Sequence, residues 1–227
     1  MKKLINGILE FRQKAGPEVR ETFTRLALGQ SPDCLFIACS DSRVVPNLFA
    51  STYPGDLFVL RNVGNLMPPS DTAGRSLGDE SEASAVEFAV ATLNVKDVVV
   101  CGHSECGAMK ALLGGRDIDG APNLSSWLRH GDGARARLER EETVGVGLAK
   151  HNQLSQLSVL EQIEHLRSYP LVQKAIAERG LRLHGWWFDI ATAAVHHYEP
   201  DERRFVLIDE TEGARYLAAL DDRSPST

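Results

Sequence analysis

Short apolar runs alternate along this chain with segments in which apolar residues recur at helical spacing. The runs at 34–38, 57–60 and 98–101 are short, continuous and apolar, as buried strands are. Strands that alternate with helices indicate an α/β protein with a mainly parallel sheet. We therefore expect these three runs to lie side by side in one sheet.

Helical spacing places helices before and between these strands. Residues 4–11 and 19–28 predict two amphipathic helices ahead of the first strand, within an N-terminal helical arm at 1–29. Residues 83–93 predict a helix that closes near Asn94 and completes a crossover between the second and third strands.

The second half of the chain repeats the alternation. Residues 154–166 predict a helix, and Pro170 starts another that Gly180 terminates. The segments 181–190 and 205–208 then predict a closing strand pair joined by a polar connection.

These elements predict about four parallel strands plus a C-terminal antiparallel edge strand, flanked by helices. We expect a single α/β domain over 1–220, which includes the arm and a loop-rich stretch at 114–147, followed by a flexible tail at 221–227.

Composition narrows the classes of function. With 25 basic and 31 acidic residues, and no basic stripe interleaved with aromatics, the chain does not resemble a nucleic-acid-binding protein. No stretch approaches the roughly 18 apolar residues of a membrane-spanning helix. The four cysteines and the absence of a signal-peptide pattern predict reduced thiols and a cytoplasmic protein.

Two polar segments follow the first and third predicted strands. They are CSDSR at 39–43 and HSEC at 103–106. Carboxyl ends of neighbouring parallel strands are where open α/β sheets bind ligands, so we expect the two segments to converge. Cys39, His103 and Cys106 then supply three zinc ligands and leave the fourth position for water, as catalytic zinc sites do.

Cys106 is expected on the first turn of the helix after the third strand, where the helix dipole would lower the pKa of its thiol. Glu105 has the character of a solvated or helix-capping carboxylate rather than a catalytic base. Cys34 and Cys101 have the character of small buried apolar residues. Six histidines are interpreted as structural, although one of them could shuttle protons: His130, His151, His165, His184, His196 and His197.

Together the two segments resemble the C-x-D-S-R and H-x-x-C motifs of the β-class carbonic anhydrases. The resemblance extends over most of the chain and includes QSP at 30–32, PG at 54–55 and RNVGN at 61–65. It implies a zinc enzyme that hydrates carbon dioxide reversibly to bicarbonate and a proton, by attack of zinc-bound hydroxide on CO2 in an apolar pocket.

The resemblance also implies roles for individual residues. Asp41 would accept the hydrogen bond of the nucleophile, and Arg43 would clamp Asp41 in a bidentate pair, although a purely structural ion pair remains an alternative. The substrate-binding residues that it implies are Gln30, Phe58, Val63, Phe88 and Gly107.

Two positions depart from patterns within the family. Many relatives with the active-site glutamine carry tyrosine where this chain has Phe88, so a role for that hydroxyl in proton transfer is lost. The other branch has tryptophan where this chain has Phe36, as part of a non-catalytic bicarbonate site. We therefore expect a site without that switch, in which Asp41 is held by Arg43 and stays off the metal.

The resemblance implies that the N-terminal helices reach across to a second subunit, giving a homodimer or a tetramer built from dimers. A free enzyme and one packaged in a carboxysome-like microcompartment both remain open. Alternative functions are hydrolysis of carbonyl sulfide or carbon disulfide, and a non-enzymatic role in which zinc only staples the fold or the chain serves as a shell or adaptor component. HSE at 103–105 also matches the H-x-E half of the zinc nucleobase deaminases, but their P-C-x-x-C half is absent.

Overall fold

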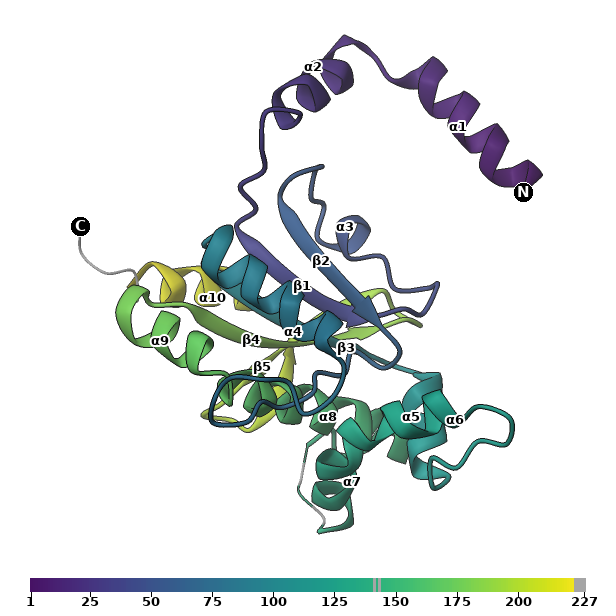
Figure 1. Ribbon diagram of the computed structural model, residues 1–227, viewed down its shortest axis with the longest axis vertical. Coiled ribbons are helices and arrows are strands. Elements are labelled where there is room, and N and C mark those ends of the chain that lie inside the picture. The colour runs from purple at the N-terminus through teal and green to yellow at the C-terminus, as the bar shows by residue number, and fades with distance from the viewer. Residues whose placement is uncertain (141, 143, 223–227) are drawn as a thin grey trace.

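The structure is a computed structural model that describes residues 1–140, 142 and 144–222. Within these residues, six strands form one sheet in the order β2-β1-β3-β4-β5-β6 (Figure 1). The first four strands in this order are mutually parallel, and the last two pair antiparallel. The predicted α/β class with a mainly parallel sheet is confirmed.

The strands are β1 (Cys34–Cys39), β2 (Leu57–Asn62), β3 (Asp97–His103), β4 (Arg182–Asp189), β5 (Ala194–Glu199) and β6 (Arg204–Leu207). The predicted direct pairing of 181–190 with 205–208 is wrong, because β5 lies between them. The sequence of β5, AVHHYE, did not predict a strand, because its two adjacent histidines interrupt the apolar run. His197 is nevertheless buried, and its Nε2 is 2.5 Å from Glu212 Oε1.

The helices are α1 (Lys2–Lys14), α2 (Pro17–Leu26), α3 (Pro46–Phe49), α4 (Glu80–Glu87), α5 (Gly107–Leu113), α6 (Pro122–Trp127), α7 (Asp132–Glu139), α8 (Lys150–Arg167), α9 (Pro170–Arg179) and α10 (Glu210–Asp222). A π-helical turn, Phe88–Thr92, continues α4, and a 3₁₀ turn, Leu128–Gly131, joins α6 to α7. The predicted ends near Asn94 and at Gly180 are confirmed, since both residues have positive φ.

Two predictions of irregular structure need correction. The stretch 114–147, expected to be loop-rich, contains α6 and α7; α7 buries only Ala134 and Leu138, so it carries little apolar periodicity. The expected tail at 221–227 begins inside α10, which continues through Asp222, and residues 223–227 lie outside the described residues.

Alternate residues of the central strands face two different cores, as the two-residue period of a strand requires. Leu35 and Val100 belong to the larger core, which α4, α5, α8 and α9 cover. Phe36 and Val99 belong to a smaller cluster on the other face, with Phe49 and Phe188. The long helix α8 is the main buried helix of the larger core.

Helix α8 packs directly against the carboxyl end of β3. A Cβ added at Gly102 would lie 2.8 Å from Val159 Cγ2 and 3.2 Å from the backbone oxygen of Ser155. The absence of a side chain at Gly102 therefore sets how closely α8 approaches the residues that follow β3.

The first two helices have no buried residues and extend away from the body of the protein (Figure 1). Their exposed apolar side chains include Leu4, Ile5, Ile8, Leu9, Phe11 and Phe23. Among the described residues, no helix has both the length and the apolar character needed to cross a bilayer.

Gly102→Ala should destabilise the protein by about 1–3 kcal/mol, because the added methyl group would push against the backbone of α8. Gly213→Ala in α10 is the matched control, since its Cβ would meet only Ile208 at 3.8 Å and alanine favours a helix. Urea unfolding at a fixed protein concentration measures both. Equal midpoints for Gly102→Ala and wild type would contradict this close packing.

Candidate active site

The carboxyl ends of two neighbouring parallel strands bring three metal-ligating side chains together. Cys39 is the last residue of β1 and His103 the last residue of β3, and these strands pair directly. Cys106 is the N-cap of α5, one position before the helical turn on which it was expected. One ligand atom from each lies within 4.8 Å of the other two, and all three residues are buried.

The imidazole of His103 is oriented for coordination. Its Nδ1 lies 2.8 Å from Ser104 O, and because a carbonyl only accepts, Nδ1 carries the hydrogen. This leaves a lone pair on Nε2, which is fully buried and has no hydrogen-bond partner within the described part of the chain. A backbone carbonyl that fixes the tautomer in this way is typical of metal-binding histidines.

The two thiols form a coupled pair. The neighbouring Cys106 thiol lowers the pKa of Cys39, against the opposing effect of burial. The Gly64 N–H also donates to Cys39 Sγ at 3.3 Å. The neighbouring Cys39 and burial raise the pKa of Cys106, whereas the backbone N–H groups in the first turn of α5 act in the expected, lowering direction. Two thiols and one imidazole are donors that zinc accepts, so the residues present fit such an ion.

Asp41 and Arg43 form a bidentate pair beside this group. Arg43 Nε donates to Asp41 Oδ1 at 2.9 Å and Nη2 to Oδ2 at 2.7 Å, and the Arg43 backbone N–H also donates to Oδ1. These hydrogen bonds hold the pKa of Asp41 well below its usual range. Asp41 Oδ2 is 4.0 Å from His103 Nε2, so an ionised carboxylate faces the ligand group while Arg43 restrains it.

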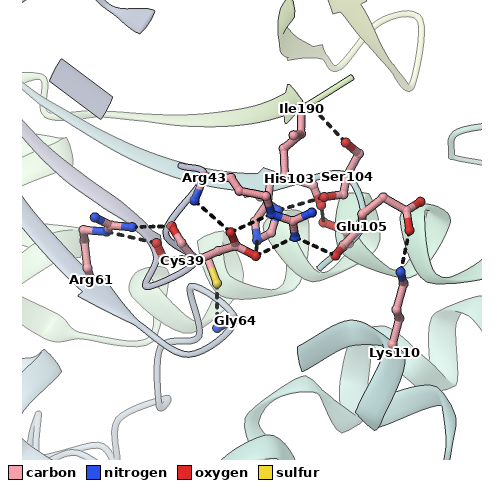
Figure 2. Close-up of polar contacts among 12 residues, drawn as sticks. Cys39, Arg43, Arg61, Gly64, His103, Ser104, Glu105, Lys110 and Ile190 are labelled. Atoms are coloured by element: carbon pink, nitrogen blue, oxygen red, sulfur yellow. Dashed lines mark hydrogen bonds and ion pairs between the residues drawn. The ribbon is translucent and has the colours of Figure 1, made fainter. Parts of the chain in front are cut away.

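Arg61, on β2, binds the backbone of the segment 39–41. The sequence motifs did not predict this role. Its Nε donates to Cys39 O at 3.0 Å and its Nη2 to Asp41 O at 2.6 Å, so one guanidinium spans the backbone on both sides of Ser40 (Figure 2). A planar guanidinium can make two such bonds at once, which fixes the direction of this backbone.

The predicted pocket residues are only partly brought together. Phe58 and Phe88 contact each other with ring centroids 5.8 Å apart, and Phe88 begins the π-helical turn, a feature frequent at functional sites. Val63 O accepts a hydrogen bond from Trp127 Nε1 at 2.7 Å, and Gly107 is the first residue of α5. Gln30 is exposed between α2 and β1, and within the described residues no hydrogen bond joins it to the site.

A second group with metal-ligand chemistry is formed by His197, Glu199 and Glu212. Arg215 already supplies its cation, since Nη2 lies 2.6 Å from both Glu199 Oε2 and Glu212 Oε1. The Cys39, His103 and Cys106 group is therefore the better candidate for a metal centre.

Comparison with known proteins agrees with this geometry. The sequence profile of the family described as "Carbonic anhydrase" matches residues 34–195. A carbonic anhydrase of Pseudomonas aeruginosa is 40% identical over 210 residues, which cover 92% of this chain and 93% of that protein.

Solved structures agree as well. The β-carbonic anhydrase CcaA superposes with a TM-score of 0.83 at 34% identity over 92% of each chain. One of two tetrameric β-carbonic anhydrases from the ascomycete Sordaria macrospora gives a TM-score of 0.73 at 32% identity, covering 87% of this chain and 97% of the other. With the strand order, the ligand group and both motifs in place, the chain belongs to the β-class carbonic anhydrases.

Proposed function

We propose that this chain hydrates carbon dioxide reversibly to bicarbonate and a proton, with a zinc ion held by Cys39, His103 and Cys106. The observation that carries the proposal is the convergence of these three buried ligand atoms within 4.8 Å of one another, beside an ionised carboxylate. Family membership supports carbon dioxide as the substrate.

When bound, zinc would supply a Lewis acid that lowers the pKa of a water molecule and makes it nucleophilic near neutral pH. The residues around it have separate tasks. His103 presents its Nε2 lone pair because Ser104 O holds the proton on Nδ1. The Gly64 N–H offsets part of the negative charge of Cys39.

Asp41 acts as a fixed hydrogen-bond acceptor for the reacting water. Arg43 bonds both of its oxygens, so the carboxylate remains ionised and cannot rotate freely. The hydrogen bond that Asp41 accepts orients the oxygen lone pair toward carbon dioxide. Because Arg43 restrains Asp41, this site is proposed to rest with the carboxylate off the metal.

An apolar pocket suits the substrate, because carbon dioxide is small and carries no net charge. Phe58, Val63 and Phe88 are proposed to line it, with Gly107 leaving room near Cys106. Val63 and Phe88 are each 43% exposed, so this pocket is open in the isolated chain. Gln30 is proposed to donate its side-chain amide to the substrate once the site is complete.

A second copy of the chain is proposed to complete the assembly as a homodimer or as a tetramer built from dimers. The support is the apolar face of α1 and α2, on which none of the described residues is buried, although Phe11 and Phe23 contact each other. All four cysteines, each within the described residues, are free thiols, which supports a cytoplasmic location.

Removal of a metal ligand should abolish zinc binding and activity together. Cys39→Ser, His103→Ala and Cys106→Ser are each expected to lose zinc, because thiolate and imidazole bonds supply most of the affinity. Metal analysis and stopped-flow carbon dioxide hydration on the same samples measure this. Cys34→Ser is the matched control, since the thiol lies at the other end of β1 and burial raises its pKa to about 12. Full zinc in Cys106→Ser would reject the ligand set.

Asp41→Asn should lower kcat about a hundredfold while zinc content stays at the wild-type level, because the amide is a poorer acceptor for the reacting water. The loss should be similar at every pH from about 6.5 to 9, since Arg43 keeps Asp41 ionised far below that range. Asp33→Asn, which removes an exposed partner of Lys96 before β1, is the control. Wild-type turnover in Asp41→Asn would remove this residue from the mechanism.

Charges placed on the apolar face of α1 should dissociate the assembly. Ile5→Asp combined with Leu9→Asp is expected to yield a smaller particle than wild type, because an aspartate cannot be buried there without a partner. Light scattering after size exclusion measures the mass, and Gln13→Asp on the same helix is the control. An unchanged mass in the double variant would show that this face does not hold the subunits together.

A further inference from the structure

Glu105 has a backbone conformation that a residue with a side chain rarely adopts. Its φ is +58°, in the left-handed region, and it lies between the ligands His103 and Cys106. Such conformations persist only where the surroundings enforce them. This conformation sets the path of the chain from the end of β3 to the N-cap of α5, and therefore the separation of the two ligands.

Asn152 in α8 makes two hydrogen bonds to Glu105. Its Oδ1 accepts the Glu105 backbone N–H at 2.8 Å, and its Nδ2 donates to Glu105 Oε1 at 3.3 Å. Asn152 is buried, so the bond to the backbone is shielded from competing water. A single side-chain amide thus bonds both the backbone and the side chain of the left-handed residue.

One turn along the same helix, Ser155 holds the other side of the turn. Its Oγ donates to His103 O at 2.9 Å, and Trp187 Nε1 donates to that Oγ at 3.2 Å. Asn152 and Ser155 lie three positions apart and so share one face of α8. That face therefore carries Asn152 Oδ1, which accepts from the Glu105 N–H, and Ser155 Oγ, which donates to His103 O.

The backbone carbonyl of Glu105 also contacts the Asp41–Arg43 pair. Arg43 Nη2 donates to Glu105 O at 3.2 Å as well as to Asp41 (Figure 2). Rotation of the Glu105 backbone would therefore move an acceptor of Arg43 along with the ligand segment. The Glu105 conformation connects α8 to both halves of the site.

The charged partners of Glu105 are less suited to restrain its backbone conformation. Lys110 Nζ and His151 Nε2 contact its carboxylate, but that side chain is half exposed. Solvent-exposed ion pairs contribute little to holding a conformation. The buried bond from the Glu105 backbone to Asn152 is the stronger restraint.

We infer that Asn152 is a positioning residue, which holds Glu105 in the left-handed conformation and thereby places His103, Cys106 and Arg43. The inference rests on the proposed zinc-dependent hydration for its effect on catalysis. Its structural part, the restraint of the Glu105 backbone, holds with or without that reaction.

The test measures the effect of Asn152→Ala in the wild-type protein and in the Glu105→Gly variant, in which residue 105 adopts positive φ without strain. Asn152→Ala should release zinc to a chelator about tenfold faster and lower kcat/KM about tenfold, as loss of an outer support of a metal site does. Glycine adopts positive φ freely, so adding Glu105→Gly should bring both quantities back to within about twofold of Glu105→Gly alone. Adding Glu105→Ala should not, because alanine keeps the strain and lacks only the carboxylate.

Gln153→Ala is the matched control, because Gln153 neighbours Asn152 on α8 and donates to Leu148 O instead. It should retain wild-type zinc release and kcat/KM. Equal zinc release by Asn152→Ala and wild type would overturn the inference. So would an effect of Asn152→Ala that is equally large in the Glu105→Gly background. If Asn152→Ala does not fold, Asn152→Ser, which is too short to reach Glu105, replaces it.

Hydrogen exchange of the Glu105 amide separates this inference from the proposed function. The amide should exchange at least tenfold faster in Asn152→Ala than in wild type, whether or not metal is bound. Wild-type protein without zinc or hydration activity would refute the proposed function, and the exchange rate would still decide the inference. An unchanged exchange rate would overturn the role of Asn152 even in a fully active enzyme.

Discussion

The burial of two thiols and an imidazole at the adjacent carboxyl ends of β1 and β3 is the constraint on which the rest of the structure depends. Ionised sulfur removed from water is costly unless a cation or hydrogen-bond donors compensate. The surroundings supply the donors, since Gly64 N–H bonds Cys39 and backbone N–H groups at the start of α5 act on Cys106. With the His103 lone pair left unpartnered among the described residues, the group has the character of a cation site.

Each ligand segment is held by an element distant in the sequence. The first is fixed by Arg61 of β2, which bonds the carbonyls of Cys39 and Asp41. The second is fixed by α8, whose Asn152 and Ser155 bond the backbone of Glu105 and His103. Gly102 allows this helix to approach closely, so the packing of the larger core and the geometry of the site depend on the same contact.

Sequence alone predicted the parts of the structure that carry a repeating pattern or a motif. The apolar runs located β1, β2 and β3, and the two motifs located the three side chains that converge and the Asp41 pair beside them. Strand β5 and helix α7 escaped prediction because their apolar residues are few and their polar residues find partners only in the folded chain. Arg61 and Asn152 were missed because they bond backbone atoms, and such contacts leave no characteristic spacing in the sequence.

The two clusters of metal-ligating residues differ in what compensates their charge. In the His197, Glu199 and Glu212 group, a guanidinium from the same chain lies between the carboxylates, and a metal ion would have to displace Arg215. Beside the cysteine group, the Arg43 guanidinium is turned to Asp41 and to Glu105 O, and Arg61 bonds backbone carbonyls. Arg43 thus neutralises the carboxylate and leaves the sulfur atoms to another cation. Under the proposed function, the chain would thereby separate the charge that orients the reacting water from the charge that activates it.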